Sequence, residues 1–304
     1  MRRVYNNEKV LCAVLSLLLV LSAFAIPALA VESQTVVPSQ NNSKDDAKGD
    51  FSYAETALTL DYNGIELAAT LAMPDAEEAV PIIIMCHGYT GSQSHFSSYA
   101  EVFATNGIAS IRFDFPAHGK SGGESTEISL LTEKAAAEFM LEYAKTVEGI
   151  DLNQINMCGQ SMGGLVATLC AVEHQDEIQA VILYYPGYPI LQFTKEGYVL
   201  GTEFDTENVP ESLEIYNYTV GSVFITDALE LDVYGEILPA LERDVLIFHG
   251  TTDDMIDLKY SEEAIKVLPS AQLVIVDGCG HGFPGFVLAD IMPLAVEFVQ
   301  EHVG

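Results

Sequence analysis

Basic side chains are scarce in this sequence, and that scarcity limits what the protein can bind. The 304 residues include 13 Lys and Arg against 44 Asp and Glu, which gives a formal charge of −31 at pH 7. Nucleic acids and anionic membrane surfaces are bound mainly through Lys and Arg, so the composition argues against both as partners. Hydrophobic residues make up 49% of the chain and charged residues only 19%, which excludes a disordered chain and predicts a globular protein.

Cysteine is also sparse. Four cysteines lie beyond residue 30, too few for a disulfide framework in a chain of this length. Each lies in or beside an apolar segment, where a free thiol packs as a small hydrophobic group. We therefore expect free thiols, but Cys86 and Cys158 end neighbouring predicted strands and a bridge between them stays open.

Residues 1–30 have the pattern of an export signal. Three basic residues precede or border an uncharged apolar run at 11–24, and Ala28-Leu29-Ala30 has the form of a cleavage site. The pattern predicts a secretory signal peptide and a secreted, extracellular protein. The alternative is an uncleaved membrane anchor that would hold the protein at the cell surface.

The chain beyond the signal divides into two parts. Residues 31–50 are polar and show no periodicity, which predicts a disordered spacer. Residues 51–304 contain no internal repeat and are expected to form the folded domain.

This domain alternates strand and helix patterns after an opening hairpin, which Asn63-Gly64 signals. The short continuous apolar runs are typical of parallel strands that are covered on both faces. The predicted strands are 54–60, 65–73, 80–86, 108–113, 155–158, 180–185, 244–248 and 272–276. The predicted helices are 96–105, 127–146, 162–173, 259–267 and 286–302. We therefore expect an α/β fold with a mostly parallel sheet between helices, and functional residues directly after the strands.

One such residue is a serine in a G-x-S-x-G motif. Gly159-Gln160-Ser161-Met162-Gly163 lies between a predicted strand and a predicted helix, the context of a nucleophile elbow. The glycines leave room for a sharp turn, and the helix N-terminus favours a developing negative charge. Ser161 is the predicted nucleophile, and an ordinary glycine-rich turn is the alternative.

A serine nucleophile needs a histidine base and an acid that orients it, in the chain order serine, acid, histidine for this fold. His281 follows the strand 272–276 in a glycine-rich loop and is the predicted base. His302, the third residue from the end of the sequence, is expected to be solvated.

Two neighbouring aspartates could supply the acid. Both Asp253 and Asp254 follow the strand 244–248. The pattern H-G-x-x-D-x-x-[VI] fits with Asp253 in the acidic position and Ile256 in the apolar one, so we prefer Asp253 and keep Asp254 open. The histidine of this pattern, His249, is expected to brace the loop.

The backbone supplies the predicted oxyanion hole. In this architecture one N–H group belongs to the residue after the nucleophile, Met162, and the other to the loop after the strand 80–86. Tyr89 is the expected loop donor, because Gly88 lets the backbone come close to the substrate. We interpret His87 as a brace of this loop.

A metal site is a weaker interpretation. Asp114 and His118 could join His87 as ligands, but the sequence has no H-E-x-x-H, H-x-H or cysteine pair. We therefore predict no metal and interpret Asp114 as a buried acceptor for turn amides.

Together, five motifs resemble those of the α/β-hydrolase superfamily: HGYTG, RFDFPAHGKSGG, GQSMGG, HGTTDDMI and GCGHGF. Within it, the chain most resembles bacterial cinnamoyl (feruloyl) esterases and related carboxylesterases, over residues 52–303. The resemblance implies that Ser161, Asp253 and His281 form the catalytic triad, that Tyr89 and Met162 hold the oxyanion, and that no cofactor is needed.

The segment 187–240 is too long for an ordinary connection and predicts a lid insertion. It contains eight aromatic residues: Tyr188, Phe193, Tyr198, Phe204, Tyr216, Tyr218, Phe224 and Tyr234. In the cinnamoyl esterases an insertion at this place shapes the aromatic substrate pocket. Apart from 218–221, the segment matches that family only weakly.

These expectations combine into a secreted serine hydrolase that cleaves hydroxycinnamate esters, small-molecule substrates, through an acyl-enzyme. The alternative within the class is a broad short-chain carboxylesterase or a lipase-like hydrolase. The alternative from another class is a non-catalytic binding module on a hydrolase scaffold, because a fold does not fix a function.

Overall fold

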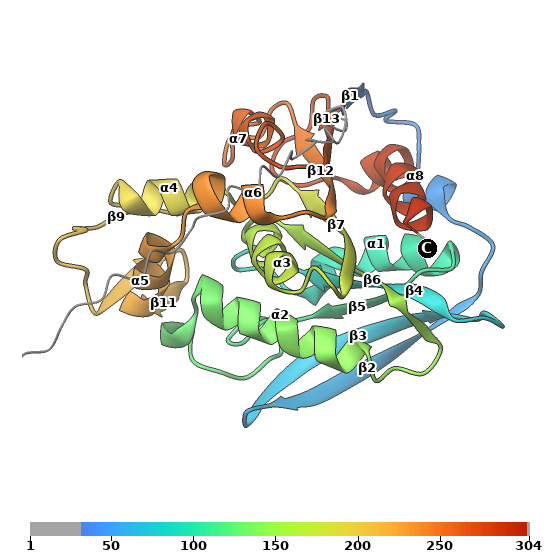
Figure 1. Ribbon diagram of the computed structural model, residues 1–304, viewed down its shortest axis with the longest axis horizontal. Helices are drawn as coiled ribbons and strands as arrows, with labels where there is room; N and C mark the ends of the chain where they lie inside the picture. Colours follow the sequence, from blue (N-terminus) through green and yellow to red (C-terminus); the bar gives the residue numbers. More distant parts are fainter. Residues whose placement is uncertain (1–31, 303–304) are drawn as a thin grey trace, which may run out of the picture.

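The computed structural model describes residues 32–302, which form a nine-stranded sheet between two layers of helices (Figure 1). The strand order is β1-β13-β12-β7-β6-β4-β5-β3-β2, and β2 and β3 form an antiparallel hairpin at one edge. The remaining neighbours pair in parallel, except for β3 with β5. The strands are β1 (Glu32–Val36), β2 (Tyr53–Tyr62), β3 (Ile65–Pro74), β4 (Val80–Cys86), β5 (Ala109–Phe113), β6 (Ile150–Gln160), β7 (Ile178–Tyr184), β12 (Asp244–Gly250) and β13 (Ala271–Val276). The predicted mostly parallel sheet is confirmed.

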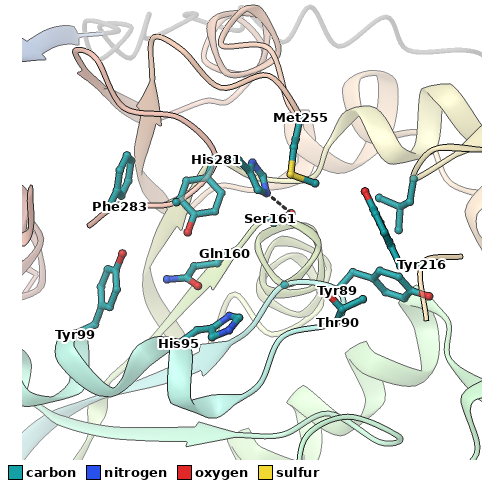
Figure 2. Close-up of a pocket in the computed structure, with 14 residues that line it drawn as sticks. Tyr89, Thr90, His95, Tyr99, Gln160, Ser161, Tyr216, Met255, His281 and Phe283 are labelled. Carbon is teal, nitrogen blue, oxygen red and sulfur yellow. Dashed lines mark hydrogen bonds between the residues drawn. The ribbon is translucent and has the colours of Figure 1, made fainter. Parts of the chain in front are cut away.

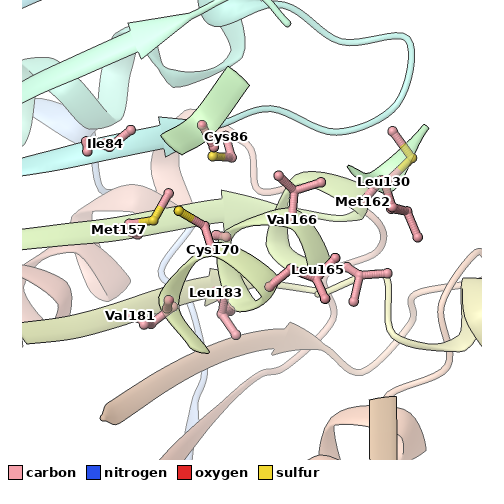
Figure 3. Close-up of a cluster of buried hydrophobic side chains, with 14 of the residues drawn as sticks. Ile84, Cys86, Leu130, Met157, Met162, Leu165, Val166, Cys170, Val181 and Leu183 are labelled. Atoms are coloured by element: carbon pink, nitrogen blue, oxygen red, sulfur yellow. The ribbon is translucent and has the colours of Figure 1, made fainter. Parts of the chain in front are cut away.

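Helices cover both faces of this sheet. The main helices are α1 (Ser97–Thr105), α2 (Leu130–Ala144), α3 (Met162–Glu173), α7 (Lys259–Ala264) and α8 (Gly285–Glu301). One core contains buried side chains of α2 and α3, and the other contains those of α1 and α8. Figure 3 shows Val166 and Cys170 of α3 beside Met157 and Leu183 of the sheet. Within the described part of the chain, no helix is long and apolar enough to span a bilayer.

The alternation of side chains along a strand explains why the cysteines stay unpaired. Cys86 of β4 belongs to the core under α2 and α3, whereas Cys158 of β6 belongs to the core on the opposite face. The register pairs Cys86 with Gly159, so the two thiols do not face one another across the strands. All four described cysteines are free and buried, and burial raises the pKa of the Cys86 and Cys158 thiols well above the ordinary value. The bridge left open by the sequence is therefore absent, and these thiols are unreactive.

Residues 32–50 are ordered, which corrects the prediction of a disordered spacer over 31–50. β1 adds a parallel edge strand to β13, with Glu32 opposite Gln272. The short 3₁₀ helix η1 (Lys44–Ala47) lies against α8 and α1, and Lys48 pairs with Glu101 at 2.6 Å. Strand pairing uses main-chain groups, so a polar segment without periodicity can still join a sheet edge. The predicted signal peptide lies outside the described residues.

A long insertion separates β7 from β12 and lies at one end of the sheet in Figure 1. Its elements are α4 (Pro189–Lys195), β8 (Tyr198–Val199), β9 (Thr202–Glu203), β10 (Ser212–Ile215), β11 (Tyr218–Gly221), α5 (Ser222–Glu230), the π-helix η4 (Val233–Ile237) and α6 (Leu238–Ala240). The chain enters this insertion at the carboxyl end of β7, the edge of the sheet where the predicted site residues also lie. Several of its aromatic side chains are core residues, because Tyr188 and Phe224 are fully buried.

His302 is not solvated as expected, because it forms a contact that should make the stability of the fold depend on pH. Its Nε2 lies 2.6 Å from Asp244 Oδ2 at the start of β12. The hydrogen bond with Asp244 raises the pKa of His302 above 6.5, while partial burial opposes this. Because the folded-state pKa is raised, the contact stabilises the fold fully below about pH 6.5 and weakens as pH rises through the folded-state value.

We expect the His302→Gln variant to lose stability mainly at mildly acidic pH. A charged hydrogen bond that is partly exposed contributes about 1 kcal/mol, which corresponds to a fall in Tm of about 2–4 °C for a domain of this size. Thermal unfolding at pH 5.5 should show this difference, and at pH 9 the variant and the wild type should unfold at more similar temperatures. An equal loss at both pH values would show that the charge of His302 does not matter.

Candidate active site

Ser161 lies at a sharp turn between β6 and α3. Its φ of 53° is in the left-handed region, which a residue with a side chain rarely adopts. A Cβ atom on Gly159 would lie 2.2 Å from the Gly163 carbonyl oxygen, and one on Gly163 would lie 2.2 Å from the Cys86 carbonyl oxygen. Both glycines are therefore required by close backbone contacts, and the turn presents the serine hydroxyl at the end of the strand.

The structure brings Ser161, His281 and Asp253 into one hydrogen-bonded chain. Figure 2 shows the contact between His281 and Ser161 as a dashed line. His281 Nε2 lies 3.0 Å from Ser161 Oγ, and His281 Nδ1 lies 2.8 Å from Asp253 Oδ2. With the proton on Nδ1 donated to the carboxylate, Nε2 can accept the proton of the serine hydroxyl. These three side chains come from the ends of β6, β12 and β13, where the sequence predicts functional residues.

Asp253, not Asp254, is the carboxylate that reaches His281. Burial alone would raise the pKa of Asp253, but hydrogen bonds from His249, His281 and the Ile256 amide outweigh burial and hold this pKa well below its ordinary value. The carboxylate is therefore ionised at neutral pH and can orient an imidazole or stabilise an imidazolium. Asp254 is exposed and forms part of a cavity wall.

The backbone groups predicted to form an oxyanion hole lie beside Ser161. A Cβ atom on Gly88 would lie 3.1 Å from Ser161 Cβ, so the loop after β4 runs directly against the serine. Within residues 32–302, neither the Tyr89 nor the Met162 amide donates to a protein acceptor. Met162 is also the first residue of α3, where the helix dipole favours negative charge.

The overall arrangement is similar to that of a solved structure, "Ferulic Acid bound to Est1E from Butyrivibrio proteoclasticus". The two chains are 29% identical and superpose with a TM-score of 0.76 over 81% of this chain and 99% of that chain. The chain has the α/β-hydrolase fold and resembles feruloyl esterases.

Curated relatives match shorter parts of the chain. The family described as "Serine aminopeptidase, S33" matches residues 77–200, which include Ser161 but not Asp253 or His281. The "Quorum-quenching protein AidA" of Acinetobacter baumannii is 31% identical over 42% of this chain and 43% of that protein. The "Putative esterase/lipase 2" of Mycoplasma pneumoniae is 23% identical over 65% of this chain and 81% of that protein. The alignment thus spans less than half the length of AidA.

His87 and Asp114 hold the loops beside this site in place. His87 Nε2 accepts the Phe115 N–H at 3.1 Å and Nδ1 donates to the Gly88 carbonyl at 2.8 Å. Burial and the nearby His118 lower the pKa of His87 to about 3, so the ring is neutral. Asp114 accepts the backbone N–H of Gln93 at 2.7 Å and that of Lys120 at 2.9 Å. His87 and Asp114 therefore brace these loops through hydrogen bonds, as the sequence predicted.

The loop that carries Asp253 is braced in the same way. His249 is fully buried, and its Nδ1 lies 2.7 Å from Ser261 Oγ. Its Nε2 donates to the Ile256 carbonyl at 2.8 Å.

The described residues contain no group of three or more His, Cys, Asp and Glu side chains placed to hold a metal ion.

Two cavities meet at Ser161 and His281. The larger has a volume of about 670 Å³ and reaches toward α1, and the smaller, about 230 Å³, lies under the insertion. Leu200, Tyr216 and Met255 contribute to the walls of both. Of the eight aromatic residues predicted to offer a substrate surface, Phe193, Tyr198 and Tyr216 line these cavities.

Several wall residues were not singled out from the sequence. His95, Tyr99, Gln160, Tyr185 and Phe283 all line the larger cavity. Gln160 occupies the first variable position of the G-x-S-x-G motif, and Phe283 follows the predicted base by two residues, so both could have been found from their neighbours. His95 and Tyr99 carry no such signal, because they lie in the short 3₁₀ helix η2 (Gln93–Phe96) and in α1, after the oxyanion loop.

Proposed function

We propose that the protein is a secreted serine carboxylic-ester hydrolase that acts on hydroxycinnamate esters through an acyl-enzyme. The observation that carries the proposal is the hydrogen-bonded chain from Asp253 through His281 to Ser161, at the point where two cavities meet. An ester has two halves on either side of its carbonyl carbon, and a pair of cavities beside one hydroxyl can hold both.

In this mechanism Ser161 Oγ attacks the ester carbonyl while His281 Nε2 takes the hydroxyl proton. Asp253 holds the ring in the required tautomer and stabilises the imidazolium that forms. The amides of Tyr89 and Met162 donate to the oxyanion of the tetrahedral intermediate. The C–O bond to the alcohol then breaks, the alcohol oxygen takes the proton from His281, and water cleaves the acyl-enzyme by the same steps.

The smaller cavity supports an aromatic acyl group. Phe193, Tyr198 and Tyr216 surround it together with Ile190, and aromatic side chains favour flat, conjugated ligands by stacking. Tyr198 and Tyr216 are also 42% and 62% exposed, so both residues border solvent as well as the cavity. The similarity to a structure with bound ferulic acid points to the same acyl class.

We expect kcat/KM for methyl ferulate or methyl p-coumarate to exceed that for a butyrate ester by roughly ten- to a hundredfold. Two good aromatic contacts at about 0.5–1.5 kcal/mol each provide this margin. The Phe193→Leu variant should reduce the margin, whereas Phe204→Leu should keep it, because Phe204 lies in the same insertion but lines neither cavity. Equal or faster turnover of the butyrate ester by the wild type would instead identify a general carboxylesterase.

The proposal of secretion depends on the pattern in residues 1–30 alone. Expression of the full chain in a bacterial host should release a protein into the periplasm or medium whose N-terminus lies close to residue 31. Recovery of the uncleaved chain in the membrane fraction would favour the anchor, and recovery in the cytoplasm would contradict export.

A further inference from the structure

Met255 is exposed and lies beside the candidate nucleophile. It follows Asp253 by two residues, and it lines both cavities together with Ser161 and His281. Figure 2 shows its side chain pointing from its loop toward these two residues. Methionine is among the residue types that are most often buried, yet Met255 is 53% exposed. Its thioether therefore borders both solvent and the space that a substrate would fill.

The other sulfur atoms of residues 32–302 are shielded from solvent. Met73 of β3 is partly buried, packs against the core and lines neither cavity. The four described cysteines are buried, and burial raises the pKa of each thiol, which makes these thiols poor nucleophiles. The remaining described methionines are at most 1% exposed: Met85, Met140, Met157, Met162 and Met292. Met255 therefore carries the most accessible sulfur atom in the described part of the chain.

The backbone of Met255 belongs to the loop that positions the Asp253 carboxylate. The Met255 N–H donates to Asp253 Oδ1 at 3.0 Å, and the Ile256 N–H donates to the same oxygen at 2.9 Å. The other carboxylate oxygen, Oδ2, lies 2.8 Å from His281 Nδ1. The bonds to Oδ1 come from main-chain groups, so a chemical change at the Met255 sulfur leaves them in place. Such a change acts on the walls of the cavities and not on the hydrogen-bonded chain.

We propose that Met255 is a modification site, at which a peroxide oxidises the thioether to the sulfoxide and thereby slows the turnover of aromatic esters. The sulfur lone pair attacks one oxygen of hydrogen peroxide, and the O–O bond breaks. The proton of the attacked oxygen moves to the departing hydroxide, which leaves as water. The sulfur is oxidised by two electrons and gains an S–O bond, and the peroxide is reduced.

The sulfoxide changes the wall where the two cavities meet. A thioether is apolar and polarisable and makes favourable contacts with aromatic rings, whereas a sulfoxide carries a polar oxygen. Nearby walls of the smaller cavity are apolar, with Ile190, Phe193 and Leu200. An aromatic acyl group that fills this cavity would remove water from the sulfoxide oxygen without offering it a hydrogen bond, which weakens binding. This effect on turnover rests on the proposed esterase function, whereas the oxidation of Met255 itself does not.

The test treats the wild type, Met255→Leu and Met73→Leu with hydrogen peroxide and maps the oxidised peptides by mass spectrometry. Leucine has a volume close to that of methionine and contains no sulfur. Met73→Leu is the matched control, because Met73 lines neither cavity. In the wild type we expect the Met255 peptide to gain one oxygen atom before the peptide of any other described methionine does.

The kcat/KM of each protein for methyl ferulate is then compared with the value of the same protein before treatment. We expect a roughly five- to thirtyfold fall in the wild type and in Met73→Leu, the effect of burying one unpaired polar group. Met255→Leu should lose less than about twofold, in line with the small effects of most surface changes. Methionine sulfoxide reductases for both sulfoxide epimers, supplied with a thiol reductant, should restore the activity of the wild type.

Labelling of Ser161 by a small fluorophosphonate distinguishes the cavity wall from the hydrogen-bonded chain. The oxidised wild type should be labelled at a rate within about threefold of that before treatment, because the bonds of Asp253 and His281 remain. A loss of labelling that parallels the loss of ester turnover would reject an effect through the wall.

The remaining outcomes separate this inference from the proposed function. Oxidation of another described methionine before Met255 would overturn the assignment of the modification site. Complete oxidation of Met255 with an unchanged kcat/KM, or an equal loss in Met255→Leu, would overturn its effect on turnover. If the untreated wild type hydrolyses no ferulate ester, the proposed function fails, and the mass shift of the Met255 peptide still decides whether this residue is the modification site.

Discussion

Replacing Ser161 by alanine is expected to lower kcat by about 10³–10⁶ while the protein stays folded. Residues of a catalytic chain act as a unit, so removal of the nucleophile leaves only the contribution of binding and oxyanion stabilisation. The change removes one oxygen atom from the side chain of Ser161, whose backbone has a positive φ. The turn itself is held by the close backbone contacts of Gly159 and Gly163 and should stay as it is. Purified wild type and variant should therefore unfold at similar temperatures.

The measurement is single-substrate kinetics with methyl ferulate on protein free of host esterases. A trace of a contaminating esterase mimics residual activity, so the variant is purified from a host that carries no copy of the wild-type chain. Retention of more than a few percent of wild-type kcat by the folded variant would show that Ser161 is not the nucleophile.

The second large effect is expected at Asp253. Asp253→Asn keeps the size of the side chain but removes the negative charge and places an N–H₂ group opposite His281 Nδ1. The N–H₂ group favours the His281 tautomer that has its proton on Nε2, and this tautomer cannot accept the proton of Ser161. We therefore expect kcat to fall by about 10³–10⁴, as in the serine-protease example of an aspartate-to-asparagine change. The pH profile of the remaining activity should also change, because the imidazolium loses its partner.

Asp254→Asn is the matched control for this substitution. The two carboxylates are adjacent in the sequence, but Asp254 is exposed and forms no bond with His281. Its replacement should change kcat/KM by less than about threefold, in line with the small effects of most surface substitutions. If Asp254→Asn were the more damaging change, the orienting acid would have to be reassigned to Asp254.

The sequence predicted the parts of the structure that local rules determine. The turn at Ser161 needs glycine on both sides, and a buried parallel strand needs a continuous apolar run, so both can be recognised from neighbouring residues. The order of Ser161, Asp253 and His281 along the chain then predicts their meeting, because the carboxyl ends of parallel strands lie at one edge of the sheet. The α/β fold and its mostly parallel sheet are confirmed on the same grounds.

Other features depend on contacts that leave no local pattern. β1 joins the sheet through main-chain hydrogen bonds, for which its polar residues give no periodic signal. Tyr99 reaches the larger cavity from the helix after the oxyanion loop, and only the packing of that helix decides which way it points. The sequence of the insertion also does not show which of its aromatic residues line the site. Tyr188 packs in the core and Tyr216 lines the larger cavity, although both are tyrosines of one segment.

The most direct test of the account is covalent labelling of the wild-type protein with a fluorophosphonate, followed by peptide mapping. The probe phosphonylates a serine that a neighbouring base activates, so it reports the nucleophile without any assumption about the natural ester. We predict one label per chain on Ser161, slower labelling in a folded His281→Ala variant, and none in Ser161→Ala. A folded wild-type protein that takes up no label, or takes it up at another serine, would contradict the assignment of this site as that of a serine hydrolase.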